Sequence, residues 1–250
     1  MISSLLQQYA SLLEDVDAHF TKAIREIPKI PCKKSCCDCC KQLFPLSMIE
    51  AYYINEGFKN LPRKERRELE REAKKQQERI EKEINPKQYK TLNADLNEIA
   101  EKRNNFTKAL QSTKIHCPLL DKKGLCQLYE HRNHDCRIHG GSFDESSNEI
   151  VGCFRHKDLF SNPESKQKFK THAIPSGHRY KEKNKLDSLL ITHLANNEAL
   201  TKTIYITTPY IAFLKDFAEV DWKNFFYEKI PAASQTQNNN TFSLIIDTTH

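Results

Sequence analysis

Five cysteines within nine residues constrain this chain more than any other feature. They occur in the run PCKKSCCDCCKQLFPLS, at Cys32, Cys36, Cys37, Cys39 and Cys40. The other four of the nine cysteines are spaced much further apart, at Cys117, Cys126, Cys136 and Cys153. Thiolates that crowd together repel one another unless a cation neutralises them. A clustered first group and a spaced second group therefore predict a metal site whose ligands come from two separated parts of the fold.

A packing role or a disulfide role for the cysteines fits the sequence less well. Cysteine can serve as a small buried hydrophobic residue, but polar residues interrupt the cluster and leave no apolar face. A disulfide framework requires an oxidising compartment, whereas the cysteine count is odd and the N-terminal residues lack the pattern of a secretory signal. We therefore expect a cytoplasmic protein whose thiols stay reduced and bind metal.

The composition predicts a limited core. Hydrophobic residues make up 38% of the 250 residues and charged residues 29%, and no apolar run is long enough to cross a membrane. We predict a mainly α fold with a small β-hairpin. Residues 1–230 are expected to form a single metal-stapled helical domain that carries a long charged helical hairpin. Residues 231–250 are expected to form a flexible tail, rich in Gln and Asn.

Hydrophobic periodicity predicts two helices around the first cysteine group. Apolar residues at three- and four-residue steps over 3–27 form a single stripe, which is typical of an amphipathic helix. Ser47 and Glu50 form a capping box at the start of a second helix, over 48–55. Gly57 is the expected C-terminal stop of that helix.

A charged helical hairpin is expected between the two cysteine groups, over 58–113. Its first helix is predicted over 63–84 and its second over 86–111, each opened by a proline. Twelve Lys or Arg and seven Glu lie between residues 59 and 90, a surplus of +5 that accounts for most of the net charge of +6. Because acids are interleaved and aromatic residues are almost absent, we interpret this hairpin as a solvated surface, and nucleic-acid binding is the less favoured interpretation.

Short elements are predicted for the second cysteine group. The pattern over 115–129 predicts a β-hairpin with a glycine-bearing turn, which would bring Cys117 and Cys126 close together. The other two cysteines are expected on a helical turn within 129–139 and on a strand over 149–154.

The C-terminal part, residues 163–230, is expected to be helical after an irregular basic stretch that ends at Lys185. Leucines at helical spacing predict a helix over 186–204. Further helices are predicted over 209–217 and around Trp222.

The cysteine spacing favours two metals or a polynuclear cluster. Cys36 and Cys39 have the two-residue separation of a metal knuckle, but the adjacent side chains of Cys39 and Cys40 diverge and suit a single mononuclear centre poorly. Cys37 is the expected spare thiol. The eight predicted ligands are Cys32, Cys36, Cys39, Cys40, Cys117, Cys126, Cys136 and Cys153. All-thiolate ligation serves zinc and iron–sulfur clusters alike, and the irregular spacing of the second group favours iron–sulfur.

Other polar residues near the second group are candidate partners of the metal site. Any histidine here can replace a thiolate or hydrogen-bond to one, although a packing or solvated role is the commoner case. The five histidines are His116, His131, His134, His139 and His156. Arg132 and Arg137 are expected either to donate to metal-bound sulfurs or to pair with Glu130 or Asp135.

These segments carry a family resemblance. PCKKSCCDCCKQLFPLSMIEA and CPLLDKKGLCQLYEHRNHDCRIHG, followed by one later cysteine, resemble the CxxCxxCC cysteine-cluster family (YkgJ-like). That family is described as zinc- or iron-chelating and often carries an iron–sulfur label, and the resemblance implies the same eight ligands. It covers under a third of the chain. Two departures are the extra residue between Cys32 and Cys36, and Asn133 in place of a proline, which we expect to loosen the turn.

Three functional hypotheses follow. The first is a metal-binding protein that holds an iron–sulfur cluster or zinc through its cysteines, with a redox role. The second is an iron–sulfur-dependent enzyme related to protein lysine N-methylases, because the CPxL…GxC element is similar to that of the flagellin lysine methylase group. The third is a zinc-stapled module that binds nucleic acid through the basic helix. Glycine-rich phosphate loops, nucleophile elbows and HExxH motifs are absent from the sequence, and no catalytic residue is assigned.

Overall fold

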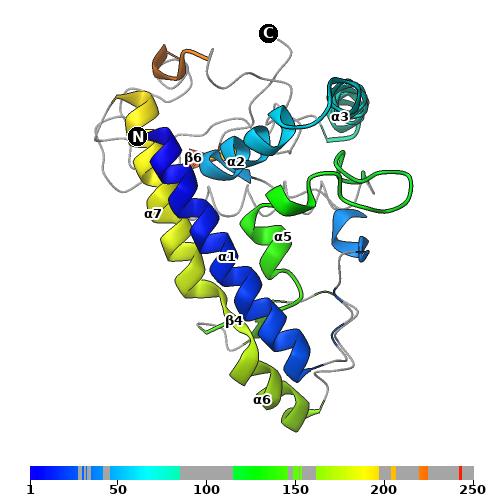
Figure 1. Cartoon of the computed structure of the whole chain (residues 1–250), viewed down its shortest axis with the longest axis vertical. Coiled ribbons are helices and arrows are strands. Elements are labelled where there is room, and N and C mark those ends of the chain that lie inside the picture. The colour runs from blue at the N-terminus through cyan, green and yellow to red at the C-terminus, as the bar shows by residue number, and fades with distance from the viewer. Residues whose placement is uncertain are drawn as a thin grey trace.

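Helices make up most of the part of the chain that the computed structural model describes (Figure 1). The structure describes residues 1–27, 30, 32, 35–41, 46–84, 115–145, 149–151, 153, 162–196, 204–206, 220–224 and 242–243. Within these ranges the mainly α class with a small strand component is confirmed. None of the helices described is both long and apolar enough to cross a bilayer.

The helices and strands have the following bounds. The α-helices are α1 (Ile2–Glu26), α2 (Met48–Lys59), α3 (Arg63–Ile84), α5 (His134–Ile138), α6 (Pro163–His172) and α7 (Ser176–Ala195). The 3-10 turns are η1 (Asp38–Lys41) and η3 (Tyr129–His131). The strands are β1 (Leu46–Ser47), β2 (Ser142–Asp144), β3 (Glu149–Val151), β4 (Ile174–Pro175), β5 (Ile204–Ile206) and β6 (Phe242–Ser243).

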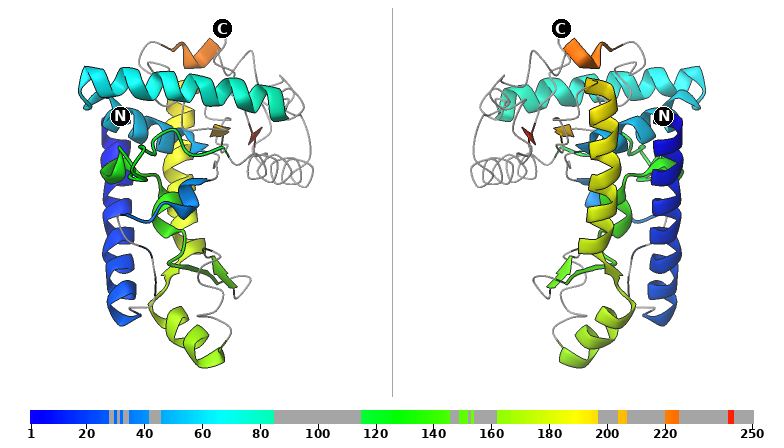
Figure 2. Two further views of the ribbon diagram at one scale, coloured as in Figure 1. Left: turned by 90° about the vertical axis from the view of Figure 1, so that its right-hand side faces the viewer. Right: turned by 90° about the vertical axis from the view of Figure 1, so that its left-hand side faces the viewer.

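The apolar stripe of α1 organises the core. Leu5, Leu12 and Leu13 are buried on one side of this helix, as its periodicity predicts. They pack in one cluster with residues of α2 and α7, and each buried leucine side chain contributes about 1.5–3 kcal/mol of transfer free energy. α1 and α7 lie side by side and run in opposite directions (Figure 1), while α3 lies across one end of the pair (Figure 2).

Two small sheets join segments that are far apart in sequence. In the first, β5 pairs antiparallel with β1 and parallel with β6. In the second, β2 pairs antiparallel with β3 and parallel with β4. The first sheet fixes the segment that leads from the cysteine cluster into α2, and the second fixes the segment that follows α5.

The charged segment is described only in part. α3 covers the predicted range 63–84. The helix predicted over 86–111 lies outside the described residues, and so does the one predicted over 209–217.

Three boundary predictions are wrong. Gly57 lies inside α2, which continues to Lys59. The stretch expected to be irregular forms α6 and the first half of α7. Asn162 caps α6 by accepting from the backbone N–H groups of Glu164 and Ser165. The helix predicted over 186–204 ends at Ala195, where Asn196 adopts the left-handed conformation (φ 49°) that often ends helices.

A buried charge cluster fixes the start of α2 against α7. The Ser47 N–H donates to the Glu50 carboxylate at 2.8 Å, so the Glu50 half of the predicted capping box is confirmed. The Ile49 N–H donates to the Asp187 carboxylate at 2.8 Å. The Lys183 ammonium lies 3.5 Å from the Glu50 carboxylate, and both side chains are almost fully buried. These groups satisfy the N–H donors that a helix leaves free at its start.

Gly57 is required by close packing, so its replacement should destabilise the protein. A Cβ at this position would lie 2.3 Å from Cγ of His131. Gly-to-Ala in a helix normally stabilises by about 1 kcal/mol. We expect Gly57→Ala instead to lower the free energy of unfolding by about 1–3 kcal/mol in urea titrations. The double variant Gly57→Ala/His131→Ala should recover part of this loss, and a stabilised single variant would contradict the close approach.

Asp187 should make stability depend on pH. Burial raises the pKa of this carboxyl to about 7, against the opposing effects of the Ile49 N–H and the Lys183 charge. The folded state therefore holds a proton that the unfolded state releases, and the free energy of unfolding should fall as pH rises from about 4 to about 7, by at most about 1.4 kcal/mol per pH unit. Urea titrations across this range should show that Asp187→Asn removes the fall, while exposed Glu68→Gln retains it.

Candidate metal centre

The structure brings the two cysteine segments together through their backbones. All nine cysteines are described, and all are free thiols. The Cys117 N–H donates to the carbonyl of Cys40 at 2.7 Å, across a separation of 77 positions in the sequence. η1 carries Cys39 and Cys40, and α5 carries Cys136. The Cys39 thiol is near enough to Cys136 to raise its pKa, so the first and second groups approach each other.

Five thiols form the larger of two groups, and we call them the inner thiols: Cys39, Cys40, Cys117, Cys126 and Cys136. Burial raises the pKa of Cys136 well above its usual range, and the nearby Cys117, Cys39 and Cys126 thiols raise it further. Burial likewise raises the pKa of Cys117 to about 12, with a contribution from Cys126. Without a cation nearby Cys117 and Cys136 stay protonated, because several thiolates in one buried place would repel one another.

Cys39 and Cys40 share a proton within the inner thiols. The hydrogen bond with Cys40 lowers the pKa of Cys39 to about 7 despite burial. The same bond raises the pKa of Cys40, together with burial. The side chains of these adjacent residues thus approach each other, contrary to the divergence expected of neighbours. Cys39 is the inner thiol that ionises most readily.

The remaining predicted ligands, Cys32, Cys36 and Cys153, form a smaller outer group. Burial raises the pKa of Cys32 to about 12, with further contributions from Cys36, Cys153 and Cys39. The Cys36 thiol lies 4.0 Å from Asp38, close enough for a weak S–H···O hydrogen bond. Cys153 is buried just after β3. Cys32 connects the outer group electrostatically to Cys39.

Cys37, the expected spare thiol, lies against the hairpin turn. Gly124 has a positive φ of 77°, and a Cβ there would lie 3.4 Å from the Cys37 sulfur. The hairpin itself is short: Leu120 and Cys126 form a single antiparallel bridge, and Asp121 closes the turn through the Leu125 carbonyl and N–H. The expected hairpin is therefore present as a tight turn.

Arg132 is a cation that acts on both groups of thiols. Its guanidinium lies 3.7 Å from the centroid of the Tyr129 ring, and its Nε donates to the Tyr129 carbonyl at 3.0 Å. Burial raises the pKa values of Cys32, Cys126 and Cys136, and the charge of Arg132 opposes that rise. A fixed positive charge beside several thiols favours their ionised, metal-binding form.

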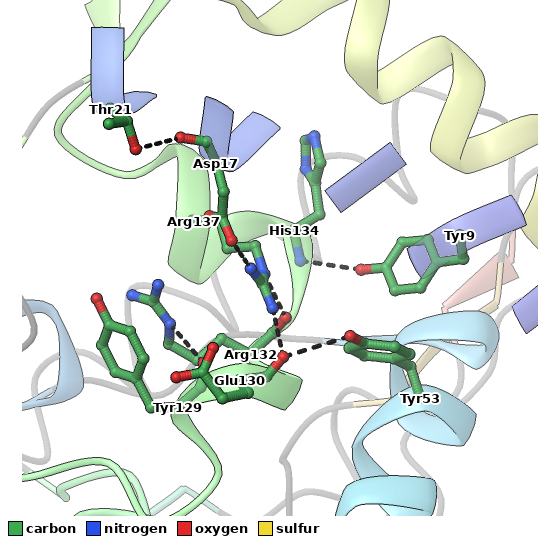
Figure 3. Close-up of polar contacts among 9 residues, drawn as sticks. All are labelled: Tyr9, Asp17, Thr21, Tyr53, Tyr129, Glu130, Arg132, His134 and Arg137. Atoms are coloured by element: carbon green, nitrogen blue, oxygen red, sulfur yellow. Dashed lines mark hydrogen bonds and ion pairs between the residues drawn. The ribbon is translucent and has the colours of Figure 1, made fainter. Parts of the chain in front are cut away.

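Arg137 has a different role from the one expected (Figure 3). Its guanidinium donates to the carbonyls of Glu130 (2.6 Å) and Arg132 (3.0 Å) and forms an ion pair with Asp17 of α1. The expected alternatives, donation to sulfur or pairing with the Glu130 or Asp135 carboxylate, are not what the structure shows. Arg137 instead holds the turn before α5 against α1.

Asn133 tightens the turn that it was expected to loosen. Its side chain is buried and accepts from the Cys136 N–H at 3.2 Å, as an N-cap of α5. The His134 N–H, next in the chain, donates to the Tyr9 hydroxyl of α1 at 2.9 Å (Figure 3). The first bond caps α5 locally, and the second fixes α5, and with it Cys136, relative to the N-terminal helix.

The histidines near the cysteines have mainly packing contacts. The His131 ring lies beside that of Tyr53, with centroids 5.2 Å apart, and the His134 ring packs edge-on against Tyr180 at 4.9 Å. These contacts are the commoner role expected for them. The remaining three have different environments: His116 is exposed, His139 is half-buried and His156 lies outside the described residues.

The side chains of the described residues do not form a metal coordination shell. In the part of the chain that the structure describes, no three Cys, His, Asp or Glu side chains are arranged to hold a metal ion. The donor type fits a thiophilic metal, and the inner thiols are close enough to affect one another's ionisation. Thiol side chains need only χ1 rotations to change where their sulfurs point, so the residues present are compatible with such a metal.

No protein-family model, curated protein or solved structure gives a significant match to this chain.

Sequence reasoning missed the polar groups that support this region. Lys183 and Asp187 are buried in α7, within or next to a stretch predicted to be irregular. Their four-residue spacing would place them on one face of a helix, but only the tertiary fold places Lys183 beside Glu50 and gives Asp187 the Ile49 N–H as its donor. The stacking of Arg132 on Tyr129 was missed as well, although their three-residue separation was a usable signal.

Replacing Arg137 should destabilise the fold strongly. Its side chain is buried, and its removal takes the Nε donor from the Arg132 carbonyl, leaves the Glu130 carbonyl with only the Tyr53 hydroxyl at 3.3 Å, and breaks the ion pair with Asp17. We expect Arg137→Met to lower the free energy of unfolding by about 3 kcal/mol in urea titrations. Arg25→Met, at an exposed position of α1, should change it by less than about 0.5 kcal/mol. Equal effects of the two substitutions would contradict this role of Arg137.

Proposed function

We propose that this chain is a metal-binding protein whose clustered cysteines hold an iron–sulfur cluster or zinc. The observation that carries the proposal is the meeting of the two cysteine segments, joined by the hydrogen bond from the Cys117 N–H to the Cys40 carbonyl. Buried, mutually repelling thiols are costly to ionise alone, and a bound cation removes that cost. The resemblance to the CxxCxxCC cysteine-cluster family supports the same ligand set.

The proposed ligands are the inner and outer thiols. Among them, the inner thiols Cys39, Cys40, Cys117, Cys126 and Cys136 are the main binding group, and Cys32, Cys36 and Cys153 complete or extend it. Bound metal would cross-link the two segments, and an iron–sulfur cluster would also supply one-electron redox chemistry. Arg132 would offset part of the negative charge of the ligands.

Iron–sulfur is the favoured metal group, with zinc as the alternative. The second cysteine group lacks the paired CxxC spacing that is usual in closed four-thiolate zinc sites. Free thiols throughout the chain suit a reducing compartment, so we propose a cytoplasmic location.

An enzymatic role related to lysine methylation rests on the CPxL…GxC resemblance alone. The residues that the structure describes add no observation in its favour. Measurable binding of S-adenosylmethionine to the metal-loaded protein would support that role.

Anaerobic purification followed by metal and sulfide analysis tests the proposal. We expect Cys39→Ser and Cys126→Ser to lose most of the bound metal and to lower stability at the same time, because ligation and folding are coupled. Cys37→Ser is the matched control, since it removes a thiol from the same cluster, and it should retain metal. Brown protein with visible charge-transfer absorption indicates iron–sulfur, and colourless protein with stoichiometric zinc indicates zinc.

Two outcomes would contradict the proposal. Wild-type protein that takes up neither iron with sulfide nor zinc under anaerobic conditions would exclude the proposed function. Equal metal loss in all three variants would show that Cys37 is a ligand and that the choice of spare thiol is wrong.

A further inference from the structure

The first three turns of α3 carry a stripe of basic side chains. At 3.6 residues per turn, side chains spaced by four, eight and eleven residues lie along one stripe. Arg63, Arg67, Arg71 and Lys74 have this spacing, and all four are exposed. Lys64 lies beside the stripe and is exposed as well. We call these five residues the basic face of α3.

Four of the seven glutamates of α3 lie on another side of the helix, whereas Glu70 lies on the stripe and the positions of Glu78 and Glu81 continue along it towards the C-terminus. At about 100° per residue, three of these acids lie about 100–160° around the helix axis from the stripe: Glu65, Glu68 and Glu72. The two ion pairs described within α3 belong to that side and to the C-terminal half, where Lys75 lies 4.0 Å from Glu72 and Arg79 lies 3.3 Å from Glu83. Both of these ion pairs involve cations outside the basic face.

The basic face keeps its charge. Arg63, Lys64, Arg67 and Arg71 line one open hollow together with Glu70, so four cations there meet one carboxylate. Among the residues that the structure describes, Arg63, Lys64 and Arg67 form no ion pair. A surplus of +3 within two turns of helix attracts anions, and an arginine guanidinium binds phosphate through paired N–H donors.

The position of α3 leaves this face accessible. Leu69 and Ala73 are buried in the main core cluster, on the side of the helix away from the stripe. α3 lies across one end of the α1–α7 pair (Figure 2). The exposed large hydrophobic residues among those described are Met1, Leu125 and Leu189, and none belongs to α3. The basic face therefore lacks the apolar side chains that an interfacial membrane helix inserts into a bilayer.

We propose that the basic face of α3 binds the phosphate backbone of nucleic acid without sequence preference. From Arg63 to Lys74 the face extends for about 16 Å, given a rise of about 1.5 Å per residue, so several phosphates of one strand can be contacted at once. Contacts from arginine and lysine to phosphate position a protein on nucleic acid but read no bases. This activity does not depend on the cysteine-bound metal, and it goes beyond the proposed metal binding.

Fluorescence anisotropy with the full-length, metal-loaded protein tests the proposal. The probes are a short labelled DNA duplex and a labelled single-stranded RNA, each titrated at several salt concentrations. The test variant is Arg63→Gln/Arg67→Gln/Arg71→Gln. The matched control, Lys75→Gln/Arg79→Gln/Lys82→Gln, also removes three positive charges from exposed positions of α3 and introduces the same helix-forming residue.

We expect the affinity of the wild-type protein for nucleic acid to fall steeply as the salt concentration rises. A large loss of affinity should be confined to the test variant. Each lost phosphate contact should reduce the slope of log K against log salt by about 0.9 on the duplex, so three lost contacts reduce it by about 2.7. The test variant should lose at least about tenfold in affinity at low salt, and the control less than about threefold. Circular dichroism should show that both variants keep their helix content.

Several outcomes would overturn the proposal. These are no measurable binding of wild-type protein to either nucleic acid at low salt, or equal losses in the test and control variants. Binding to anionic lipid vesicles or to a polyglutamate peptide, without binding to nucleic acid, would assign the basic face to a different anionic partner and would also overturn it. Because metal content is measured separately, failure here leaves the cysteine proposal intact.

Discussion

The meeting of two distant cysteine segments is the constraint on which the rest of this structure depends. One backbone hydrogen bond, from the Cys117 N–H to the Cys40 carbonyl, ties the segments together and places five thiols within electrostatic reach of one another. Burial raises the free energy of each thiolate, and repulsion between neighbouring thiolates raises it further. A bound cation lowers this free energy, so a dense arrangement of thiols suits metal binding.

The helices around the cysteines form a frame for them. Arg137 binds the turn before α5 to α1, and Asn133 caps the short helix that carries Cys136. On the other side, Glu50 and Asp187 bind the N-terminal N–H groups of α2 next to Lys183. Buried polar groups of this kind are costly unless paired, so they fix the relative positions of helices more narrowly than apolar packing does. The cysteine-bearing turns are therefore held by neighbours that are themselves rigidly placed.

Much of the local structure could be predicted from residues that act on near neighbours. The stripe of α1, the capping box at Ser47 and the span of α3 all depend on periodicity or capping within a few residues. Predictions failed where a distant contact decided the outcome. Gly57 has the position expected of a helix stop, but it lies inside α2. A glycine is needed there because His131 occupies the space that a Cβ would fill. The helical start of α7 had weak periodicity, since its buried Lys183 and Asp187 are polar.

The sequence by itself determined the type of chemistry and the order of the main helices, because thiol density, charge and periodicity are properties of the chain. Only the tertiary structure decided which thiols meet, which cation acts on them and where the charges of α3 gather. Thus Arg132 and Arg137 are equivalent candidates in the sequence, but one affects the thiols while the other binds backbone carbonyls and Asp17. The physical reason is that electrostatic and hydrogen-bond energies depend on distance and burial, which are set when remote segments pack together.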